Sequence, residues 1–545
     1  MENFNLSTKE MLDTKDSYLA RKILLIFITI SGIVSLFAFA YCLKNGLILL
    51  YADSYFHLNI ARRVIDGITP GLVQLGTVWL PIPHITMLPF VWSDLLWRTG
   101  IAGSIPSMIA FIFSSYLIFL ILKKLTESLF ISFFAGLLFV LNPNILYLQS
   151  IPMTEIIFIL TALSSIYFLI LWVKEFHRIY KIKWLIFSSI FAFLGSLVRY
   201  EGWFLILAEV LVILYVYVFI YRKDRNNVDL KMLEGDSLIF LFPATLGVIT
   251  WFFYNWVIFG NPLEFLSGKY SAYYQQLSFL EQGKLFTKGN LHSSVESIVW
   301  SVIDNSGYVL IVALLIFSCI ALPVFLRRFF LLRKITRNGQ LLILSLFLLF
   351  SPAIFQVYSL YEGNTILYVS EVFPTERIFN VRYGILVFPG VVIALGIIVS
   401  LLRGSRFLLI PLIGIQLLVF LMGYQSVSSF DDGKYGMSSA NKSSDAKECW
   451  EYLTMLRKEH ELVLASSLVN DIYIPNYKIQ FKNIIHEGSY KYWQESLSNP
   501  AQYATWILMQ EDDFDPIYQL RNNPDLEQKF YKDKQCNNWS VWHIK

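Results

Sequence analysis

The sequence predicts an α-helical polytopic membrane protein with about eleven transmembrane helices and a small α/β domain at its C-terminus. Hydrophobic residues make up 56% of the chain and charged residues only 15%, whereas soluble domains have roughly 45–50% apolar and about 25% charged residues. The mean hydropathy is +0.54. Several apolar runs are long enough to cross a hydrocarbon core of roughly 30 Å as helices. They do not alternate with a period of two, so helices rather than barrel strands are expected.

The first apolar run, 23–43, follows Arg21 and Lys22. Ala38-Phe39-Ala40 near its end is similar to a signal-peptidase site. The polar leader is long for a signal peptide, however, and many further spans follow. We therefore expect an uncleaved first helix after a cytoplasmic tail of residues 1–22.

Ten further apolar segments are predicted to span the membrane. They lie at about 101–122, 129–141, 153–173, 184–199, 202–220, 237–258, 306–326, 340–358, 383–402 and 407–424. Alternate connections are rich in lysine and arginine, as cytoplasmic loops are. The basic residues of these connections are Lys123, Lys124, Lys174, Arg178, Lys181, Lys183, Arg222, Lys223, Arg225, Arg327, Arg328, Arg333, Lys334, Arg337, Arg403 and Arg406. With an odd number of spans, the N-terminus is expected in the cytoplasm and the segment after Tyr424 on the opposite side.

Residues 23–425 thus form the predicted membrane domain, and residues 426–545 a soluble extracytoplasmic domain. Helical patterns near 448–458 and 490–497 and strand-like runs at 461–465 and 503–509 indicate an α/β fold for the latter. Cys449 and Cys536 would face an oxidising compartment in many organisms. A disulfide between them is one hypothesis, and two free thiols are the other.

Polar residues with chemical uses gather in the predicted outer loops. The first such loop, about 44–100, begins Tyr51-Ala52-Asp53-Ser54-Tyr55-Phe56-His57. Asp53 would lie near the lipid–water boundary, where a carboxylate can stay ionised. Helical spacing of apolar residues predicts an amphipathic surface helix over 54–66, with Asp53 and His57 on one face. The structural interpretations are that Asp53 is the N-cap of this helix and that His57 is a packing residue.

Three further outer segments carry charged candidates. Glu155 begins the fourth span, where an acid gains roughly 0.3–1 kcal/mol from the helix dipole and is also a functional candidate at the rim of a bundle. Arg199 and Glu201 lie at a tight turn between two spans, and Arg382 ends a loop that also holds Glu362, Glu371, Glu376 and Arg377. Arginine donates a planar fork to phosphate. The structural alternative for each arginine is a snorkelling side chain.

Together these segments resemble the GT-C superfamily of membrane glycosyltransferases, in particular the family 39-like relatives of protein O-mannosyltransferases and the bacterial aminoarabinose transferase. The resemblance covers about residues 20–425. It rests on the acid after the first span and on Asn142-Pro143, Thr154-Glu155, Arg199-Tyr200-Glu201-Gly202, Gly260-Asn261-Pro262-Leu263 and Asn380-Val381-Arg382-Tyr383. The chain has Asp53-Ser54 where mannosyltransferases have Asp-Glu, so their acceptor class does not transfer. It also lacks a clear acceptor-binding motif of oligosaccharyltransferases, which disfavours N-glycosylation.

The resemblance implies a polyprenyl-phosphate sugar as donor, a glycan, lipid or protein as acceptor, and an inverting displacement at the anomeric carbon. Asp53 would be the general base. Arg382 or Arg199 would stabilise the departing lipid phosphate. Glu155 would orient the acceptor or help hold a cation, and His57 and Glu201 are candidates to support the acceptor or the site. Whether a divalent cation takes part stays open, because Asp53 and Glu155 are too few ligands to assign one.

Two other classes of protein compete with this interpretation. A multi-span transporter or lipid flippase would explain the hydrophobicity without catalysis, and it predicts polar residues at mid-membrane and broken helices. A structural or assembly subunit would leave Asp53 replaceable. Nothing in the sequence suggests a nucleic-acid partner. The polar residues at one outer rim favour an enzyme that acts at the membrane surface.

Overall fold

The computed structural model describes residues 2–177, 181–221, 229–268, 271–332, 336–402, 404–440 and 444–545. Of the basic residues used to predict topology, Arg178, Arg222, Lys223, Arg225, Arg333, Lys334 and Arg403 lie outside the described residues. The chain forms two compact units. Unit 1 comprises Met1–Asn45, Ser107–Ser150 and Thr154–Asp432, and unit 2 comprises Gly46–Pro106, Ile151–Met153 and Gly433–Lys545.

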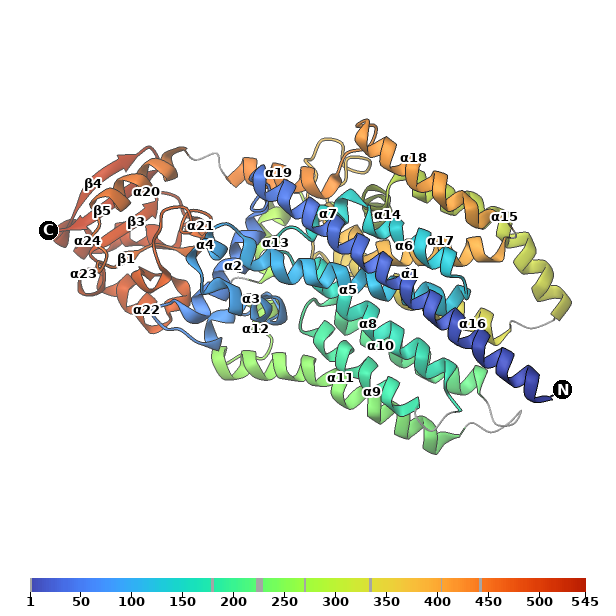
Figure 1. Ribbon diagram of the computed structural model, residues 1–545. Helices are drawn as coiled ribbons and strands as arrows, with labels where there is room; N and C mark the ends of the chain where they lie inside the picture. The colour runs from blue at the N-terminus through green and yellow to red at the C-terminus, as the bar shows by residue number, and fades with distance from the viewer. Residues whose placement is uncertain are drawn as a thin grey trace. The chain divides into compact units, whose positions relative to one another are not determined.

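Unit 1 is a bundle of long apolar helices (Figure 1). Its long helices are α1 (Glu2–Lys44), α5 (Ile101–Thr126), α8 (Glu155–Lys174), α9 (Lys181–Ser196), α10 (Glu201–Tyr215), α11 (Leu230–Phe259), α14 (Leu291–Ser306), α15 (Tyr308–Leu332), α16 (Arg337–Glu362) and α17 (Phe388–Leu401). Shorter elements are α6 (Leu129–Val140), α7 (Pro143–Leu148), the π-helical turn η2 (Val216–Ile220), α12 (Glu264–Ser267), α13 (Ala272–Glu281), η3 (Val381–Val387), η4 (Ser405–Leu408), α18 (Leu409–Leu421) and α19 (Ser428–Ala440). Helix α9 packs on α8 and α11, and α6 packs on α17.

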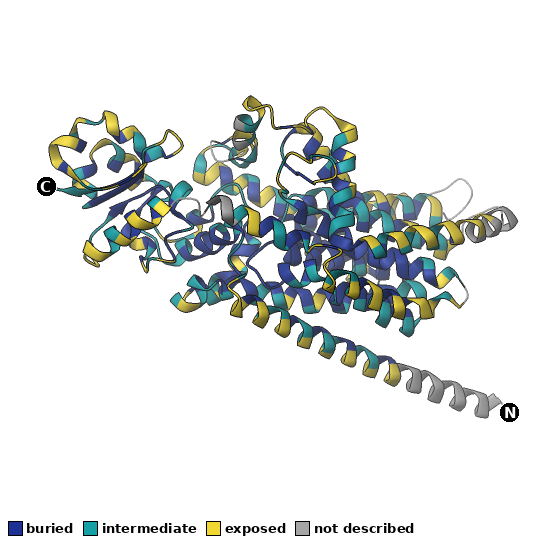
Figure 2. Cartoon of the chain, turned by 90° about the horizontal axis from the view of Figure 1, so that it is seen from above, coloured by how far each residue is buried: buried dark blue, intermediate teal, exposed yellow. Residues whose placement is uncertain are grey.

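Every predicted span corresponds to helix in the described residues, and the protein is an integral membrane protein. Seven described helices are long and apolar enough to cross a membrane, or eight if α14 and the first part of α15 form one bent span. Helix α1 carries exposed residues along much of its described length (Figure 2), and these include the large apolar residues Leu25 and Phe37. Such a surface requires lipid as its solvent. The number eleven stays a prediction, since α6, α9 and α18 are short.

The chain breaks sharply at Gly307, where α14 and α15 meet at 108°. A break leaves backbone groups without helical partners, and these must be satisfied where water is excluded. Two glutamine side chains supply the partners. The side-chain oxygen of Gln416 accepts from the Leu310 amide at 3.2 Å, and that of Gln425 accepts from the Tyr308 amide at 3.0 Å. In the predicted topology, α14 belongs to an outer segment, so this bend lies at the outer end of a span.

Unit 2 joins the helices of the predicted first outer loop to the C-terminal α/β domain. The loop contributes α2 (Ala52–Ile65), η1 (Leu72–Leu75), α3 (Ile82–Val91) and α4 (Asp94–Arg98). The C-terminal part contributes α20 (Ser444–Leu456), β1 (Val463–Leu464), α21 (Ser467–Asn470), η5 (Phe481–Asn483), β2 (Ile484–Ile485), η6 (Glu487–Ser489), α22 (Lys491–Ser498), α23 (Pro500–Tyr503), β3 (Trp506–Gln510), η7 (Pro516–Asn522), α24 (Pro524–Lys529), β4 (Phe530–Cys536) and β5 (Trp539–Ile544). The sheet order is β2-β1-β3-β5-β4, parallel in its first three strands and antiparallel beyond.

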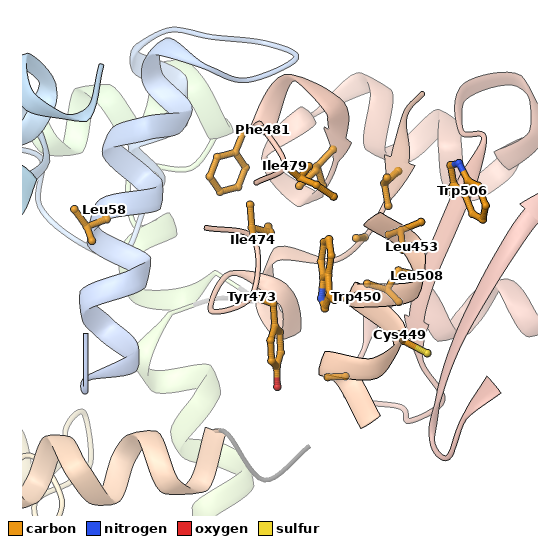
Figure 3. Packing of buried hydrophobic residues seen from close by; sticks show 14 of the residues in the cluster. Leu58, Cys449, Trp450, Leu453, Tyr473, Ile474, Ile479, Phe481, Trp506 and Leu508 are labelled. Carbon is orange, nitrogen blue, oxygen red and sulfur yellow. The ribbon is translucent and has the colours of Figure 1, made fainter. Parts of the chain in front are cut away.

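One hydrophobic core runs through both parts of unit 2. Leu58 of α2 belongs to the same buried cluster as Trp450 and Leu508 of the C-terminal domain (Figure 3). Trp97 of α4 is a member of the same cluster. Cys449 and Cys536 form a disulfide that ties α20 to β4, which confirms the first of the two hypotheses. Residues 426–545 therefore do not form their whole hydrophobic core by themselves, because the predicted first outer loop supplies part of it.

Candidate functional site

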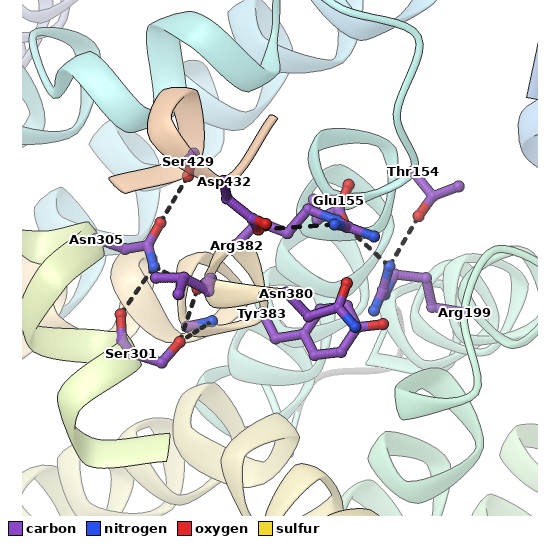
Figure 4. A network of polar contacts seen from close by, with 12 residues as sticks. Thr154, Glu155, Arg199, Ser301, Asn305, Asn380, Arg382, Tyr383, Ser429 and Asp432 are labelled. Carbon is purple, nitrogen blue, oxygen red and sulfur yellow. Dashed lines mark hydrogen bonds and ion pairs between the residues drawn. The ribbon is translucent and has the colours of Figure 1, made fainter. Parts of the chain in front are cut away.

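Four of the six predicted site residues come together in unit 1. Glu155 is the first residue of α8, Arg199 and Glu201 flank the turn between α9 and α10, and Arg382 lies in η3. Glu155, Arg199 and Arg382 meet in one buried polar cluster (Figure 4), and Glu201 joins it through its ion pair with Arg199. The predicted tight turn is observed, with α9 ending at Ser196 and α10 beginning at Glu201.

Glu155 is the centre of this cluster, and its side chain is fully buried. Its Oε1 atom accepts from Nη1 of Arg199 at 3.1 Å and from Nε of Arg382 at 3.2 Å. Its other oxygen, Oε2, is buried and has no hydrogen-bond partner among the described residues. A buried carboxylate needs such cationic partners to remain charged. One acid thus holds two arginines from distant parts of the chain.

Arg199 is held on three sides. Its Nε and Nη2 atoms form a two-point contact with the Glu201 carboxylate at 3.2 and 3.0 Å, and Nη1 also donates to the Thr154 hydroxyl at 2.8 Å. Burial disfavours its charge, but the carboxylates of Glu201 and Glu155, at 3.0 and 3.1 Å, compensate for that effect. This arginine is therefore fixed as a cation.

Arg382 lies between two carboxylates from different elements. Glu155 contacts its Nε, and Oδ2 of Asp432 on α19 lies 3.8 Å from its Nη1. Both carboxylates and the guanidinium are buried. The ring of Tyr383 lies beside both arginines, with guanidinium carbons 5.3 and 5.4 Å from its centroid, which is within the range of cation–π attraction.

The backbone that carries Arg382 is clamped by α14. The hydroxyl of Ser301 and the amide of Asn305 donate to the Val381 carbonyl at 2.7 and 2.6 Å. The Gly384 amide in turn donates to Ser301 Oγ at 2.9 Å. The Asn305 side-chain oxygen accepts from Ser429 Oγ at 2.9 Å, so the same residue also holds the segment leading to Asp432. Ordered buried hydrogen bonds of this kind fix side-chain positions.

Asp53 and His57 lie on α2 in unit 2. Helix α2 begins at Ala52 with Tyr51 at the N-cap, so Asp53 lies in the first turn and the N-cap interpretation is wrong. The helix dipole favours a carboxylate in the first turn of a helix, and this favours Asp53 at its position. His57 is buried, and its Nδ1 atom lies 2.9 Å from Nε2 of His84 on α3. His84 is fully buried, and burial lowers its pKa well below the usual value.

No metal-binding cluster of side chains is evident in the described part of the chain. Among the residues that the structure describes, no group of three or more His, Cys, Asp or Glu side chains is placed to hold a metal ion. Glu155 and Asp432 lie on either side of the Arg382 guanidinium. Arg382 is thus the cation that these two carboxylates share.

Asp432 and Asn305 were missed by the sequence interpretation. Asp432 follows the last predicted span, and the pair Asp431-Asp432 shortly after the end of that span was the available signal. Asn305 offered no such signal, because one amide in a serine-rich helix is typical of packing. Its role follows from the backbone groups that the fold brings to it.

Neither a family model nor a curated protein sequence matches the chain. Among solved structures, it is similar to ArnT from Cupriavidus metallidurans bound to undecaprenyl phosphate, with a TM-score of 0.53 and 11% identity over 95% of this chain and 97% of that chain. The apo state of the same protein gives a TM-score of 0.51 and 12% identity over 96% and 98% of the chains. Similarity to the apo oligosaccharyltransferase of Archaeoglobus fulgidus is weaker, at a TM-score of 0.46 and 11% identity over 89% and 69%.

These comparisons define the class of architecture. The protein is a polytopic membrane protein with the GT-C fold, as the sequence predicted. More particularly, its fold is similar to that of ArnT over nearly the whole length of both chains. At 11–12% identity the likeness extends to the fold alone, and the chemistry has to be argued from the site.

Proposed function

We propose that the protein is a glycosyltransferase that moves a sugar from a polyprenyl-phosphate donor to an acceptor on the extracytoplasmic face. The observation that carries this proposal is the buried Glu155–Arg199–Arg382 cluster on a fold shared with ArnT, whose crystal structure holds undecaprenyl phosphate. Two fixed guanidiniums suit an anionic phosphate, because they are aligned before the reaction begins. A polyprenyl tail would dissolve in lipid while its phosphate and sugar stay at the interface.

The proposed reaction is an inverting displacement. The acceptor hydroxyl attacks the anomeric carbon, and the bond from that carbon to the phosphate oxygen breaks. Asp53 takes the hydroxyl proton as general base, a role worth typically 10²–10⁴-fold in rate. The bonding electrons leave with the polyprenyl phosphate, whose negative charge Arg382 and Arg199 stabilise.

The carboxylates of the cluster hold the arginines in place for this step. Glu155, Glu201 and Asp432 together supply three negative charges against two guanidiniums. An incoming phosphate would therefore compete with these carboxylates for the same donors. We propose that the donor phosphate takes over part of the Arg382 contacts, and that Glu155 keeps both guanidiniums oriented while it does so. His57 and Glu201 are proposed to support the site.

Substitution of the arginines tests the proposed phosphate contact. Arg382→Ala is expected to lower retention of a polyprenyl-phosphate hexose by the purified protein at least tenfold, because a buried charged donor is lost. Arg377→Ala is the matched control, since Arg377 is exposed in the same loop. Equal, undiminished binding in Arg382→Ala and Arg199→Ala would remove the assignment.

A turnover assay tests the chemistry. Wild-type protein incubated with polyprenyl-phosphate sugars and candidate acceptors is expected to release polyprenyl phosphate. Asp53→Asn is expected to lose this release while it still folds and binds the donor. Normal transfer by Asp53→Asn would overturn the proposed base.

A transporter or flippase is the second candidate, because the bundle holds buried ionisable residues, of which Glu209 and Asp236 were not singled out from the sequence. Glu209 lies within α10, fully buried, and accepts from the Ser165 hydroxyl at 2.6 Å. Lys181 and Asp236 form a buried ion pair at 2.7 Å, and the Tyr217 hydroxyl also donates to Asp236. Ionisable groups inside a membrane often mark transport paths. Loss of lipid movement in Glu209→Gln vesicles, with sugar transfer absent in wild type, would favour this candidate.

A further inference from the structure

An open cavity in unit 2 has a charged lining that the proposed reaction does not use. It has a volume of about 400 Å³ and lies among α4, the end of α20 and the chain that leads into β2. Arg98, Arg457 and Lys478 contribute three cations to the lining, and Asp94 and Glu459 contribute two acids. A second cavity of about 400 Å³ shares Arg457 and Lys478 with it. The two form one groove, and each lies within the size range of ligand sites, about 300–1,000 Å³.

The groove carries an excess of positive charge in fixed positions. Arg98 donates to the Pro475 carbonyl at 3.2 Å, and Arg457 donates to the Lys458 and Glu461 carbonyls at 2.9 and 2.7 Å. Backbone carbonyls hold these guanidiniums in place, while the carboxylates of Asp94 near Arg98 and of Glu459 and Glu461 near Arg457 offset part of their charge. Burial lowers the pKa of both arginines, which means that each is partly desolvated and would gain from an anion.

The two acids of the lining offset this charge only in part. Asp94 lies 2.6 Å from Nη2 of Arg62, a residue of α2 outside the lining, and its other oxygen lies 3.7 Å from Arg98. Its charge is therefore already matched. Glu459 is the other acid of the lining, and the lining also holds the cations Arg457 and Lys478. An anion with a single charge fits the remaining imbalance.

Exposed apolar residues lie close in sequence to the residues that line the groove. Leu95 lies between Asp94 and Arg98 and is 68% exposed, and Trp92 just before them is 71% exposed. On α20, Met455 and Leu456 lie between the lining residues Thr454 and Arg457 and are 83% and 50% exposed. Large apolar side chains at this exposure are available to contact a lipid surface.

The position of the groove residues in the sequence indicates the surroundings of this surface. Arg98 immediately precedes α5, which begins at Ile101 and is one of the membrane-spanning helices. Arg98 thus lies within one helical turn, along the chain, of a membrane-spanning helix, which favours lipid headgroups as the surroundings of this end of the groove. Tryptophan is enriched at the level of lipid headgroups, and long basic side chains can extend to it.

We propose that this groove binds the phosphate headgroup of an anionic phospholipid, while Trp92, Leu95 and Met455 insert among the lipids around it. The proposal fits each part of the surface, because the cations match the phosphate and the apolar rim matches the acyl boundary. Lipid binding there would anchor the helices of the first outer loop and the C-terminal domain to the bilayer. It does not depend on the proposed catalytic activity.

A lipid-retention experiment tests the headgroup contact. Purified full-length protein is titrated with phosphatidylglycerol or phosphatidylcholine and examined by native mass spectrometry. Wild type is expected to prefer phosphatidylglycerol, and Lys478→Gln is expected to lower that preference about fivefold, the effect of one basic residue near an anionic surface. Lys482→Gln is the matched control, because Lys482 is exposed nearby on η5 and does not line the groove.

Two results would overturn the proposal. One is the absence of any preference for phosphatidylglycerol, or an equal loss in the Lys478→Gln and Lys482→Gln variants. The other is binding of free glucuronic acid that Lys478→Gln abolishes while phosphatidylglycerol retention is unchanged, which would make the groove a saccharide site instead.

A depth measurement tests the apolar rim independently. Spin labels are placed at Met455→Cys and, as a control, at Phe514→Cys, an exposed apolar position of unit 2 outside the groove. Cys42 and Cys319 are first replaced by serine. In nanodiscs with phosphatidylglycerol, the Met455 label is expected to be more accessible to oxygen than to a water-soluble nickel reagent, and the Phe514 label the reverse. Equal accessibility at both positions would contradict membrane insertion.

Discussion

At the scale of single residues, the site depends on charges that are satisfied only by partners far along the chain. Glu155 contacts Arg199 and Arg382, and Arg382 also faces Asp432. Removing one member of a buried ion pair typically costs about 3–5 kcal/mol, because the other charge is left uncompensated. The cluster therefore serves the fold of unit 1 as well as any chemistry.

Asp471 shows the same dependence in unit 2. It is buried, lies 3.4 Å from Nη1 of Arg63, and its backbone carbonyl accepts from the Asn59 side chain at 2.7 Å. Burial raises the pKa of Asp471 to about 7, although Arg63 opposes the rise and Glu487 adds to it. Two buried histidines, His84 and His486, face the same arginine, and burial lowers the pKa of both well below the usual value.

We predict that Asp471 makes the stability of the protein depend on pH. A raised folded-state pKa favours the folded state below the ordinary value of 3.8, and that contribution is lost as the pH rises through about 7. Asp471→Asn cannot titrate. The wild-type thermal unfolding midpoint minus that of Asp471→Asn is therefore expected to decrease between pH 5 and 7. Above pH 7 this difference is expected to stay constant.

The histidines act in the opposite direction. Because the pKa values of the histidines are lowered in the folded state, the free energy of unfolding decreases as the pH falls below about 6.5. This decrease occurs in both proteins, so it cancels when wild type and Asp471→Asn are compared. A difference between wild type and Asp471→Asn that stays constant from pH 5 to 8 would contradict the prediction.

At the scale of elements, the junction of α14 and α15 positions Arg382. Gly307 has a φ of 102°, a conformation that side chains other than glycine rarely adopt. A Cβ atom there would collide with the side-chain amide of Gln416. The same junction holds Asn305, which clamps the Val381 carbonyl.

We predict that Gly307→Ala lowers the free energy of unfolding by about 1–3 kcal/mol, through strain and overpacking. The double variant Gly307→Ala/Gln416→Ala is expected to lose less than the sum of the single variants, because the clash is removed. Thermal unfolding in detergent measures both effects. Gly414→Ala on α18 is the control, since a Cβ atom there meets nothing within 4 Å, and its midpoint should not fall.

At the scale of the whole molecule, the first outer loop and the C-terminal domain fold as one unit. Residues 46–106 and 433–545 share a core although the membrane bundle separates them in sequence. The candidate base Asp53 is thus carried by the same compact body as the C-terminal sheet. A change in the C-terminal domain is expected to reach α2 through Asp471 and its contacts with Asn59 and Arg63.

The predicted topology has a direct test in right-side-out membrane vesicles. In a Cys319→Ser background, an impermeant maleimide is expected to label Asp513→Cys from outside, because the C-terminal domain is predicted to be extracytoplasmic. Lys123→Cys is expected to be labelled only after permeabilisation, because it lies in a predicted cytoplasmic loop. Both side chains are exposed. The reverse pattern would invert the orientation.

Sequence reasoning found the residues whose chemistry is visible from their position along the chain. An acid at the start of a span identified Glu155, and charged residues at a turn identified Arg199 and Glu201. Arg382 stood out as an arginine next to an apolar segment. Asp432 and Asn305 were missed, because their roles depend on backbone groups that become neighbours only after folding.

The sequence by itself determined that this protein crosses a membrane as a bundle of helices with a small α/β domain, because hydrophobic runs and local periodicity are properties of short segments. The tertiary structure alone decided that Glu155 lies between Arg199 and Arg382, and that α2 belongs to the core of the C-terminal domain. Those facts depend on contacts between residues tens to hundreds of positions apart. Such contacts are set by the packing of whole helices and by the need to pair buried charges.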